Sequence, residues 1–143
     1  MDILDAVKAA FQQYFDFQGR ASRAAFWYFM AFMIAGLSLL PFIDGFLFDT
    51  GPVPQAGPWA SFGYTVAHGP LSALFGMVVL VPWLSVSTRR LHDIGRPGWW
   101  MYFGFIPPFG WLFMLIWLTR EGVVGDNDYG PDPLAGQGVE GHT

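Results

Sequence analysis

Residues 24–48 read AAFWYFMAFMIAGLSLLPFIDGFLF, a run of apolar residues in which Asp44, near the far end, carries the single formal charge. A helix of about 20 residues crosses the hydrocarbon core of a membrane, which is about 30 Å thick, because each residue adds about 1.5 Å. The run is therefore long enough to cross with some tilt. We predict a transmembrane helix over 24–48.

Two further runs, 70–88 and 99–119, contain no charged residue. A lysine or arginine in the middle of a membrane costs about 2.5–3.5 kcal/mol on insertion scales. All seven lysine and arginine residues lie outside the three runs. None of the runs shows the polar face with a period of 3.6 that a buried helix of a soluble protein would carry. The predicted fold is an all-α integral membrane protein with three transmembrane helices.

The third run contains Pro107 and Pro108 at its centre, and this leaves a second layout open. If residues 106–110 formed a hairpin, each arm would hold about eight residues, or only about 12 Å of helix. Such arms could re-enter the membrane as a pair but could not cross it twice. Of the two layouts, we favour a continuous helix over 99–119.

Residues 2–15 form a different kind of segment. At 100° per residue their apolar side chains fall within a stripe about 120° wide, with aspartate and glutamine on the opposite face. This pattern predicts an N-terminal amphipathic helix that lies in the membrane interface or against the other helices. It is not typical of a secretory signal, because its first residues are acidic and the first long apolar run begins only at residue 24.

The composition agrees with a membrane protein and excludes several functions. Of 143 residues, 53% are hydrophobic and 13% are charged, against about 25% charged in soluble domains. The absence of cysteine excludes disulfides, thiolate nucleophiles and zinc-thiolate sites. A net charge of -4 argues against a nucleic-acid partner. We predict one membrane domain over 1–133 and a flexible polar tail over 134–143.

The distribution of basic residues predicts the orientation. Three precede the first run, none lies in residues 49–70, three lie between the second and third runs, and one follows the third. Because cytoplasmic segments are enriched in lysine and arginine, we expect a cytoplasmic N-terminus and an external 49–70 loop. Three crossings would place the acidic tail outside, whereas a re-entrant third segment would place all seven basic residues inside.

A first polar motif, residues 17–27, joins the amphipathic segment to the first run. Arg20 and Arg23 are three residues apart and could face lipid phosphate groups together. Ser22 is placed to cap the following helix, and Gly19 allows a bend. The motif is either a positively charged membrane anchor or a dedicated headgroup site.

A second polar motif, residues 88–100, lies between the second and third runs. If the preceding helix continues to Asp93, Arg89 and Asp93 form a pair four residues apart, which leaves Arg90 and His92 free for a ligand. Residues 95–98 then end the helix. His92 cannot be paired with Asp93 as a catalytic base, because adjacent helical positions point about 100° apart. The candidate headgroup or partner contacts of both motifs are Arg20, Arg23, Arg89, Arg90, His92, Asp93 and Arg96.

A third polar motif, residues 125–133, follows the third run. Its alternating aspartates faintly resemble a calcium loop, but the required glutamate is missing, since Gln137 stands in its place. We interpret the segment as a turn built by Asn127, Tyr129, Gly130, Asp132 and Pro133. No metal or cofactor is expected. The glycines of residues 136–141 match a dinucleotide fingerprint only by coincidence, because no strand precedes them.

These three motifs, in this order around apolar runs, resemble the bacterial inner-membrane proteins of the domain of unknown function 805 family. The resemblance covers roughly residues 11–133 and rests on the pattern of Gly19, Arg20 and Arg23, on Arg89 to Asp93 with Gly98-Trp99-Trp100, and on Asn127 to Pro133. It implies a small multi-pass protein of the cytoplasmic membrane and supplies no activity, cofactor or catalytic residue. If the three motifs belonged to one site they would share a membrane face, which only the re-entrant layout allows.

From these observations we predict a non-enzymatic membrane protein with a structural, lipid-contacting or partner-binding role. Its expected partners are membrane lipids, including anionic headgroups at the arginine-rich cytoplasmic turn, and a second copy or another membrane protein. The alternative is a transporter or a translocation-accessory protein, suggested by the proline-broken third run and by Asp44. We expect Asp44 itself to lie near the outer interface, in contact with water.

Overall fold

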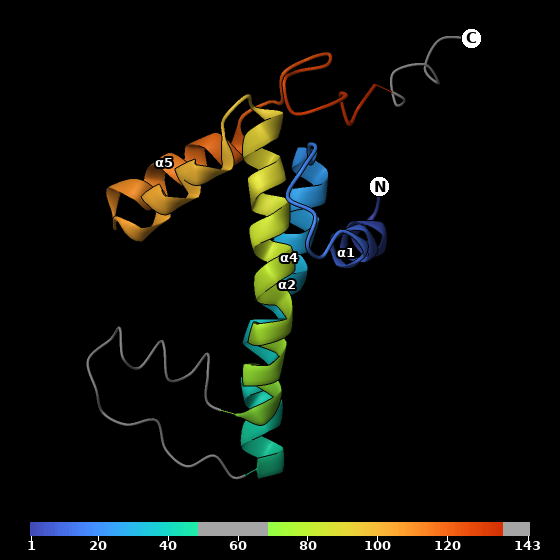
Figure 1. The fold of residues 1–143 in the computed structure, drawn as a ribbon. Helices are drawn as coiled ribbons and strands as arrows, with labels where there is room; N and C mark the ends of the chain where they lie inside the picture. Colours follow the sequence, from blue (N-terminus) through green and yellow to red (C-terminus); the bar gives the residue numbers. More distant parts are fainter. Residues whose placement is uncertain (49–68, 136–143) are drawn as a thin grey trace. The chain divides into compact units, whose positions relative to one another are not determined.

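The computed structural model is all-helical and describes residues 1–48 and 69–135. Its helices are α1 (Ile3–Gln12), α2 (Arg23–Phe48), α4 (Pro70–Asp93), the 3-10 helix η1 (Gly98–Phe105) and α5 (Phe109–Thr119) (Figure 1). The described residues form two compact units, one of residues 1–29 with 82–135 and one of residues 30–48 with 69–81. Most of the predicted external loop and of the predicted flexible tail lies outside the described residues.

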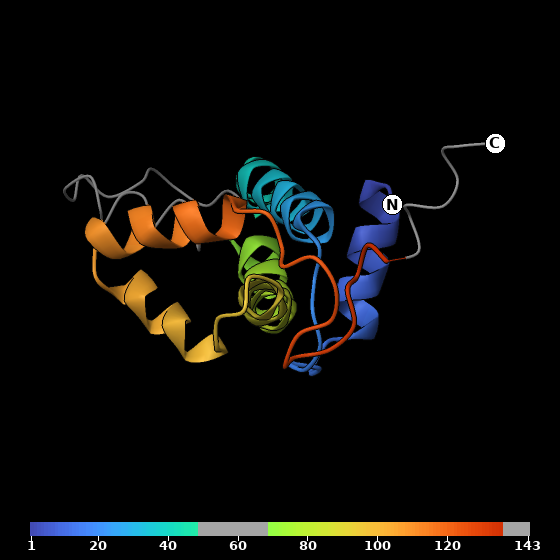
Figure 2. The same ribbon diagram turned by 90° about the horizontal axis from the view of Figure 1, so that it is seen from above.

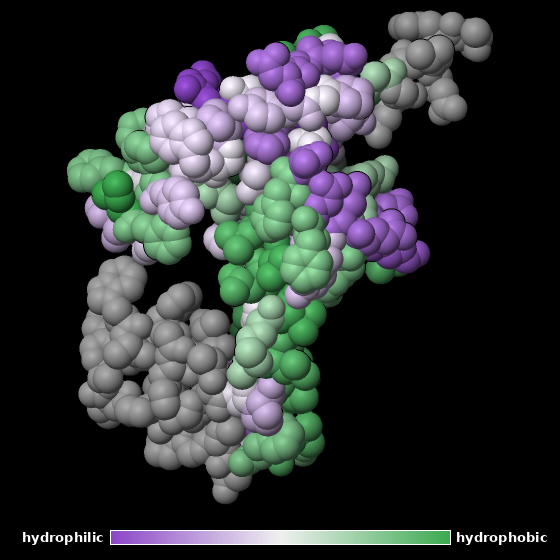
Figure 3. All heavy atoms as spheres, viewed as in Figure 1, coloured by the Kyte–Doolittle hydropathy of each residue, from purple (hydrophilic) through white to green (hydrophobic). Residues whose placement is uncertain are grey.

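Helices α2 and α4 have the length and composition of membrane spans. They hold 26 and 24 residues, or about 39 and 36 Å, and each exceeds the hydrocarbon core of about 30 Å. Only 6% of the most apolar window of α2 is buried, and Phe46 is 89% exposed. Figure 3 shows hydrophobic residues along these two helices. Helices are confirmed for the first two apolar runs, and α4 continues five residues beyond the predicted end at residue 88.

The third apolar run is divided into two short helices, so the predicted continuous helix over 99–119 is not confirmed. Helix η1 has 8 residues and α5 has 11, which gives each a length of about 16 Å. The break falls at Pro107 and Pro108, which lack N–H groups and restrict the residues before them. The two helices lie side by side as a hairpin (Figure 2), with the rings of Trp100 and Trp117 4.8 Å apart.

Close backbone contact holds this hairpin together. Gly110 is buried, and a side chain there would collide with the backbone carbonyl of Phe103. The Gly110 N–H donates to the carbonyl of Ile106 at 2.7 Å, and Trp111 Nε1 donates to the carbonyl of Gly104 at 2.8 Å. The hairpin therefore depends on the absence of a side chain at residue 110.

Helix α1 lies within the predicted amphipathic segment, and its formation is confirmed. It starts with a capping box in which the Asp2 carboxylate accepts the N–H of Asp5 and the Asp5 carboxylate accepts the N–H of Asp2. Its buried residues are the small Ala6 and Ala10, whereas Leu4 is 65% exposed. The helix thus packs against the protein through its small side chains and leaves large apolar side chains uncovered.

Within the second unit, α2 and α4 contact each other closely at Gly36. The ring of Phe75 packs over this glycine, where a side chain would collide with it. The same ring meets Phe32 edge to face, with 5.6 Å between the centroids. A small residue on one helix thus admits a large one from the other, as in many membrane helix pairs.

Candidate functional site

The candidate site lies at the C-terminal end of α4, where the helix is stopped by a Schellman motif. The N–H of Gly95, which has a φ of 71°, donates to the carbonyl of His92, and the N–H of Arg96 donates to the carbonyl of Leu91. The predicted stop at residues 95–98 is confirmed. The motif presents the last turn of α4, with its arginines and Asp93, to the segments around it.

Asp93 is the centre of a buried ionic cluster made by Arg20, Arg90 and Asp93. Its Oδ1 accepts hydrogen bonds from Arg20 Nε at 3.0 Å and lies 2.9 Å from Arg20 Nη2, and its Oδ2 accepts from Arg90 Nη1. The side chains of Arg20, Arg90 and Asp93 are 1%, 0% and 4% exposed. One buried carboxylate therefore forms ion pairs with two buried guanidinium groups.

The remaining donors of the two arginines bind backbone carbonyls in the last turn of α5 and just after this helix. Arg20 donates to the carbonyls of Val123 and Gly125. Arg90 donates to the carbonyl of Leu118 at 3.2 Å and to that of Arg120. Because a guanidinium group carries five N–H donors in a planar fork, each arginine can bind a carboxylate and a stretch of backbone at once. The cluster fastens residues 118–125 to the end of α4.

The predicted ion pair between Arg89 and Asp93 is wrong. Asp93 binds Arg90, three residues before it, and Arg20, 73 residues before it. Arg89 instead donates to the side-chain carbonyl of Gln13, which follows α1. Spacing along one helix shows which residues can meet within it but not which distant residue competes for the same carboxylate. Arg90, predicted to be free for a ligand, is fully buried.

His92 joins all three polar motifs. Its Nδ1 lies 3.1 Å from the carbonyl oxygen of Gly19, so this nitrogen carries the proton, because a carbonyl can only accept. Its ring stacks on Tyr129 with 4.1 Å between the centroids and 9° between the planes. Asn127 Nδ2 donates to the His92 carbonyl at 3.0 Å. His92, which was predicted to be free for a ligand, therefore has its hydrogen bonds and its stacking partner within the protein itself.

The third motif folds as a turn stabilised by its own side chains. Asn127 Oδ1 accepts the N–H of Tyr129 at 2.9 Å, and the backbones of Asn127 and Gly130 bond to each other in both directions. The Asp132 carboxylate accepts the N–H groups of Leu134 and Gly125, both at 2.9 Å, and these bonds lower the pKa of Asp132. Pro133 lies between these bonded residues. The turn predicted over 125–133 is confirmed.

The carboxylates that suggested a calcium loop are used in this turn. Asp126 accepts the N–H of Asp132 at 3.2 Å, and Asp132 itself accepts two backbone N–H groups. In residues 1–48 and 69–135, no three histidine, aspartate or glutamate side chains are grouped so that they could hold a metal ion.

Two of the seven candidate contacts, Arg23 and Arg96, remain exposed. Arg23 starts α2, where the hydroxyl of Ser22 accepts the N–H of Ala25 at 3.2 Å as the predicted cap. Its side chain is 50% exposed and lies 3.4 Å from Glu121. The guanidinium carbon of Arg96 lies 5.6 Å and 5.4 Å from the ring centroids of Trp100 and Trp117.

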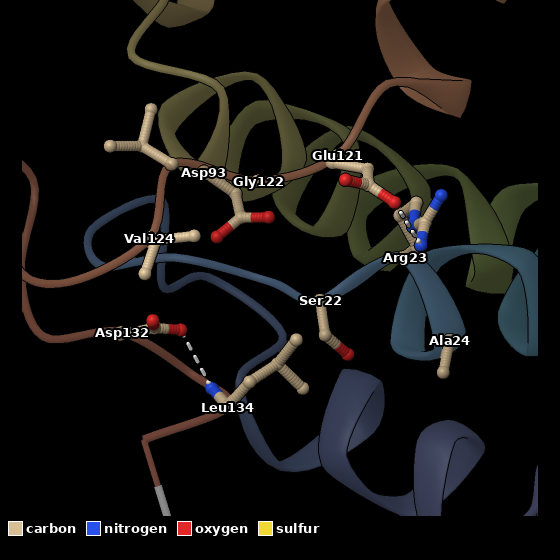
Figure 4. Close-up of a pocket in the computed structure, with 10 residues that line it drawn as sticks. Ser22, Arg23, Ala24, Asp93, Glu121, Gly122, Val124, Asp132 and Leu134 are labelled. Carbon is tan, nitrogen blue, oxygen red and sulfur yellow. Dashed lines mark hydrogen bonds and ion pairs between the residues drawn. The ribbon is translucent and has the colours of Figure 1, made fainter. Parts of the chain in front are cut away.

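A cavity of about 480 Å³ lies beside the ionic cluster. The start of α2, the end of α4 and residues 121–134 enclose it (Figure 4). Its charged residues are Arg23, Asp93, Glu121 and Asp132, and its apolar ones include Val124 and Leu134. Asp93 and Asp132 are already bonded within the protein, so the exposed charges left at the cavity belong to Arg23 and Glu121.

The role of Asp44 was not predicted from the sequence. Asp44 is fully buried, so its expected contact with water is wrong. Its Oδ1 accepts the N–H of Leu71 at 3.0 Å, and its Oδ2 accepts the N–H of Ser72 at 2.8 Å and the Ser72 hydroxyl. These are the second and third N–H positions of α4, which a capping side chain ordinarily satisfies. The residue before α4 is Gly69, which has no side chain, and Asp44 of α2 supplies the cap instead.

We therefore expect Asp44→Ala to lower the midpoint of thermal unfolding, because it leaves two N–H groups at the start of α4 without an acceptor. Asp44→Asn keeps one carbonyl acceptor and should have the smaller effect. Differential scanning fluorimetry of the purified protein in detergent checks this order. Equal midpoints for both variants and the parent chain would show that the cap contributes nothing.

Two membrane-length helices and a polar cluster used in packing define a helical membrane-type fold. The chain belongs to the family described as "Protein of unknown function (DUF805)", which matches residues 14–131.

Two relatives come from Escherichia coli (strain K12). The chain is 34% identical to "Inner membrane protein YhaH" over 122 residues, which cover 85% of this chain and 90% of the relative. It is 32% identical to "Inner membrane protein YhaI" over 125 residues, which cover 87% of this chain and 92% of the relative. No solved structure matches the chain.

Proposed function

We propose that this protein is a non-enzymatic bacterial inner-membrane protein that crosses the membrane twice, through α2 and α4, with both termini in the cytoplasm. The names of its relatives support the inner membrane as its location. The buried ionic cluster supports the topology. Arg20 precedes α2, Asp93 ends α4, and the carbonyls of Val123 and Gly125, which Arg20 binds, follow α5. Segments that bond to one another at one point must lie on one side of a membrane.

Under this topology all seven lysine and arginine residues lie on the same side, which the positive-inside rule identifies as the cytoplasm. The tail is then cytoplasmic as well, in place of the external tail that follows from three crossings. The short hairpin of η1 and α5 is consistent with two crossings, because neither arm reaches across about 30 Å.

We assign the cluster of Arg20, Arg90 and Asp93 a structural role, as a clasp that closes the cytoplasmic end of the protein. The guanidinium groups of Arg20 and Arg90, which were predicted to contact a ligand, are buried and bonded to the protein itself. Arg23 and Arg96, which stay exposed, are the remaining candidates for anionic headgroups. Asp44 gives no support to the transport alternative, because its carboxylate caps α4.

Single cysteines test the topology directly, since the chain has no cysteine of its own. We would place them at the exposed Gln12 and Asp128, and at Ser61 between α2 and α4, and treat intact spheroplasts with a membrane-impermeant maleimide. Gln12→Cys and Asp128→Cys should react only after permeabilisation, whereas Ser61→Cys should react at once. The parent chain, without cysteine, is the control.

Reaction of Asp128→Cys in intact spheroplasts would contradict the two-crossing topology and favour three crossings with an external tail. Protection of Ser61→Cys before permeabilisation would also contradict it.

A further inference from the structure

The hairpin of η1 and α5, residues 98–119, exposes large apolar side chains along both arms. It contains no charged residue. Tyr102 on η1 is 71% exposed, Phe105 at the end of η1 is 81% exposed, and Phe109 at the start of α5 is 70% exposed. A helix that is apolar on all sides is stable only where protein or lipid surrounds it. Within the described residues, nothing covers these side chains.

The length of the hairpin matches one leaflet of a membrane. Each arm is about 16 Å long, and half of a hydrocarbon core of about 30 Å is about 15 Å. The base of the hairpin is formed by the start of η1, which follows α4, and by the end of α5, which precedes the segment that the clasp holds. Its tip, at residues 105–109, lies away from the end of α4 (Figure 1). A hairpin anchored at one face can thus reach no further than the middle of the membrane.

The polarity of the hairpin changes from base to tip. At the base, Arg96 lies over the rings of Trp100 and Trp117, and Trp99 stacks on Trp100 with 4.5 Å between the centroids. Tryptophan and arginine are typical of the membrane interface, where an apolar body and a polar group are both accommodated. The tip holds phenylalanine, isoleucine and proline. This order is the one expected for a segment whose base lies at the headgroups and whose tip lies in hydrocarbon.

The surface of the hairpin suits acyl chains better than another membrane helix. Association of helices in membranes depends on small residues that let backbones approach and on polar groups that bond between helices. Gly110 faces inward against Phe103, and the indole N–H of Trp111 bonds to Gly104 inside the hairpin. The outward side chains, such as those of Leu112 and Phe113, are large and apolar.

We propose that residues 98–119 form a wedge embedded among the acyl chains of the cytoplasmic leaflet alone, with its tip no deeper than the middle of the membrane. The side of the membrane rests on the proposed function above, whereas confinement to one leaflet rests on the length and polarity of the hairpin.

Spin labels measure the depth of the hairpin. Nitroxide would be attached to Ile106→Cys at the tip, to Trp99→Cys at the base and to Phe42→Cys on α2, each in the full chain in vesicles of phosphatidylcholine and phosphatidylglycerol. Ile106 is suitable because its side chain is 56% exposed and its bonds to Phe103 and Gly110 use the backbone. Collisions with oxygen report contact with lipid, and collisions with a water-soluble nickel chelate report contact with water.

We expect the label at residue 106 to collide with oxygen and not with nickel, at a depth of no more than about 15 Å. The label at residue 99 should lie at the interface. The label at residue 42, on an exposed face of α2, is the control for a lipid-facing site that does not depend on the hairpin.

Three results would overturn the wedge. Nickel accessibility at residue 106 would place the tip in water, and protection from both reagents would indicate a protein partner or a second copy around it. Reaction of Ile106→Cys with impermeant maleimide from the periplasmic side would show that the hairpin crosses the membrane. The labelling of residues 61 and 128 reports the two-crossing topology separately. The wedge can therefore fail while the two-crossing topology stands, whereas a periplasmic residue 128 would overturn both proposals.

Discussion

Replacing Asp93 by alanine is expected to lower the free energy of unfolding by about 3–5 kcal/mol, because it removes one carboxylate from two buried guanidinium groups. Arg20 and Arg90 would keep their bonds to backbone carbonyls but lose their counter-ion. The measurement is chemical unfolding of the protein in detergent micelles, followed by tryptophan fluorescence.

The matched control is Arg23→Ala, which breaks an ion pair on the surface. Arg23 and Glu121 are 50% and 85% exposed, and such pairs are worth about 0–1 kcal/mol. Asp93→Asn should fall between the two, since the amide oxygen can still accept a hydrogen bond. If Asp93→Ala and Arg23→Ala unfolded at the same denaturant concentration, the clasp would have no part in stability.

The second large effect is expected at the hairpin. Gly110→Ala should lower the free energy of unfolding by about 1–3 kcal/mol or more. The new Cβ would occupy the position of the Phe103 carbonyl, which is part of the backbone and cannot rotate away as a side chain can. Either α5 or η1 must then move. Spin labels on the exposed Tyr102 and Phe113, one on each arm, should report a wider distance distribution.

Gly104→Ala is the control for this substitution within the same hairpin. A side chain at residue 104 would lie 4.0 Å from Met114, which is an ordinary van der Waals contact. Both substitutions replace glycine in a helix and bring a similar gain in conformational entropy, so the difference between them isolates the collision at Phe103. An unchanged distance distribution in Gly110→Ala would show that the arms do not contact through this residue.

Local features of the fold could be predicted from the sequence because their causes lie within a few residues. Ser22 caps α2 and Gly95 stops α4, since each acts on backbone groups of its own turn. The amphipathic pattern of residues 2–15 predicted α1 for the same reason. The pattern did not show that α1 packs through Ala6 and Ala10, because the contacting surface lies elsewhere in the chain.

The pairing of the polar residues could not be predicted in this way. Arg20 meets Asp93 across 73 residues, and Asp44 meets Ser72 across 28 residues. The spacing of four residues on a helix predicted a pair between Arg89 and Asp93. Spacing along one helix says nothing about Arg20, which the fold brings to the same carboxylate. Pro107 and Pro108 indicated where the helix of the third run breaks. They did not show whether the run is a kinked membrane span or a hairpin, because both contain a break at that place.

The sequence by itself determined that long segments of this protein are apolar helices, because the free energy of transferring side chains out of water is a property of the residues. Only the tertiary structure decided which charged groups remain exposed. The charged groups of Arg20, Arg90 and Asp93 are buried where chain segments far apart in sequence fold together, and that depends on how the chain returns to the end of α4.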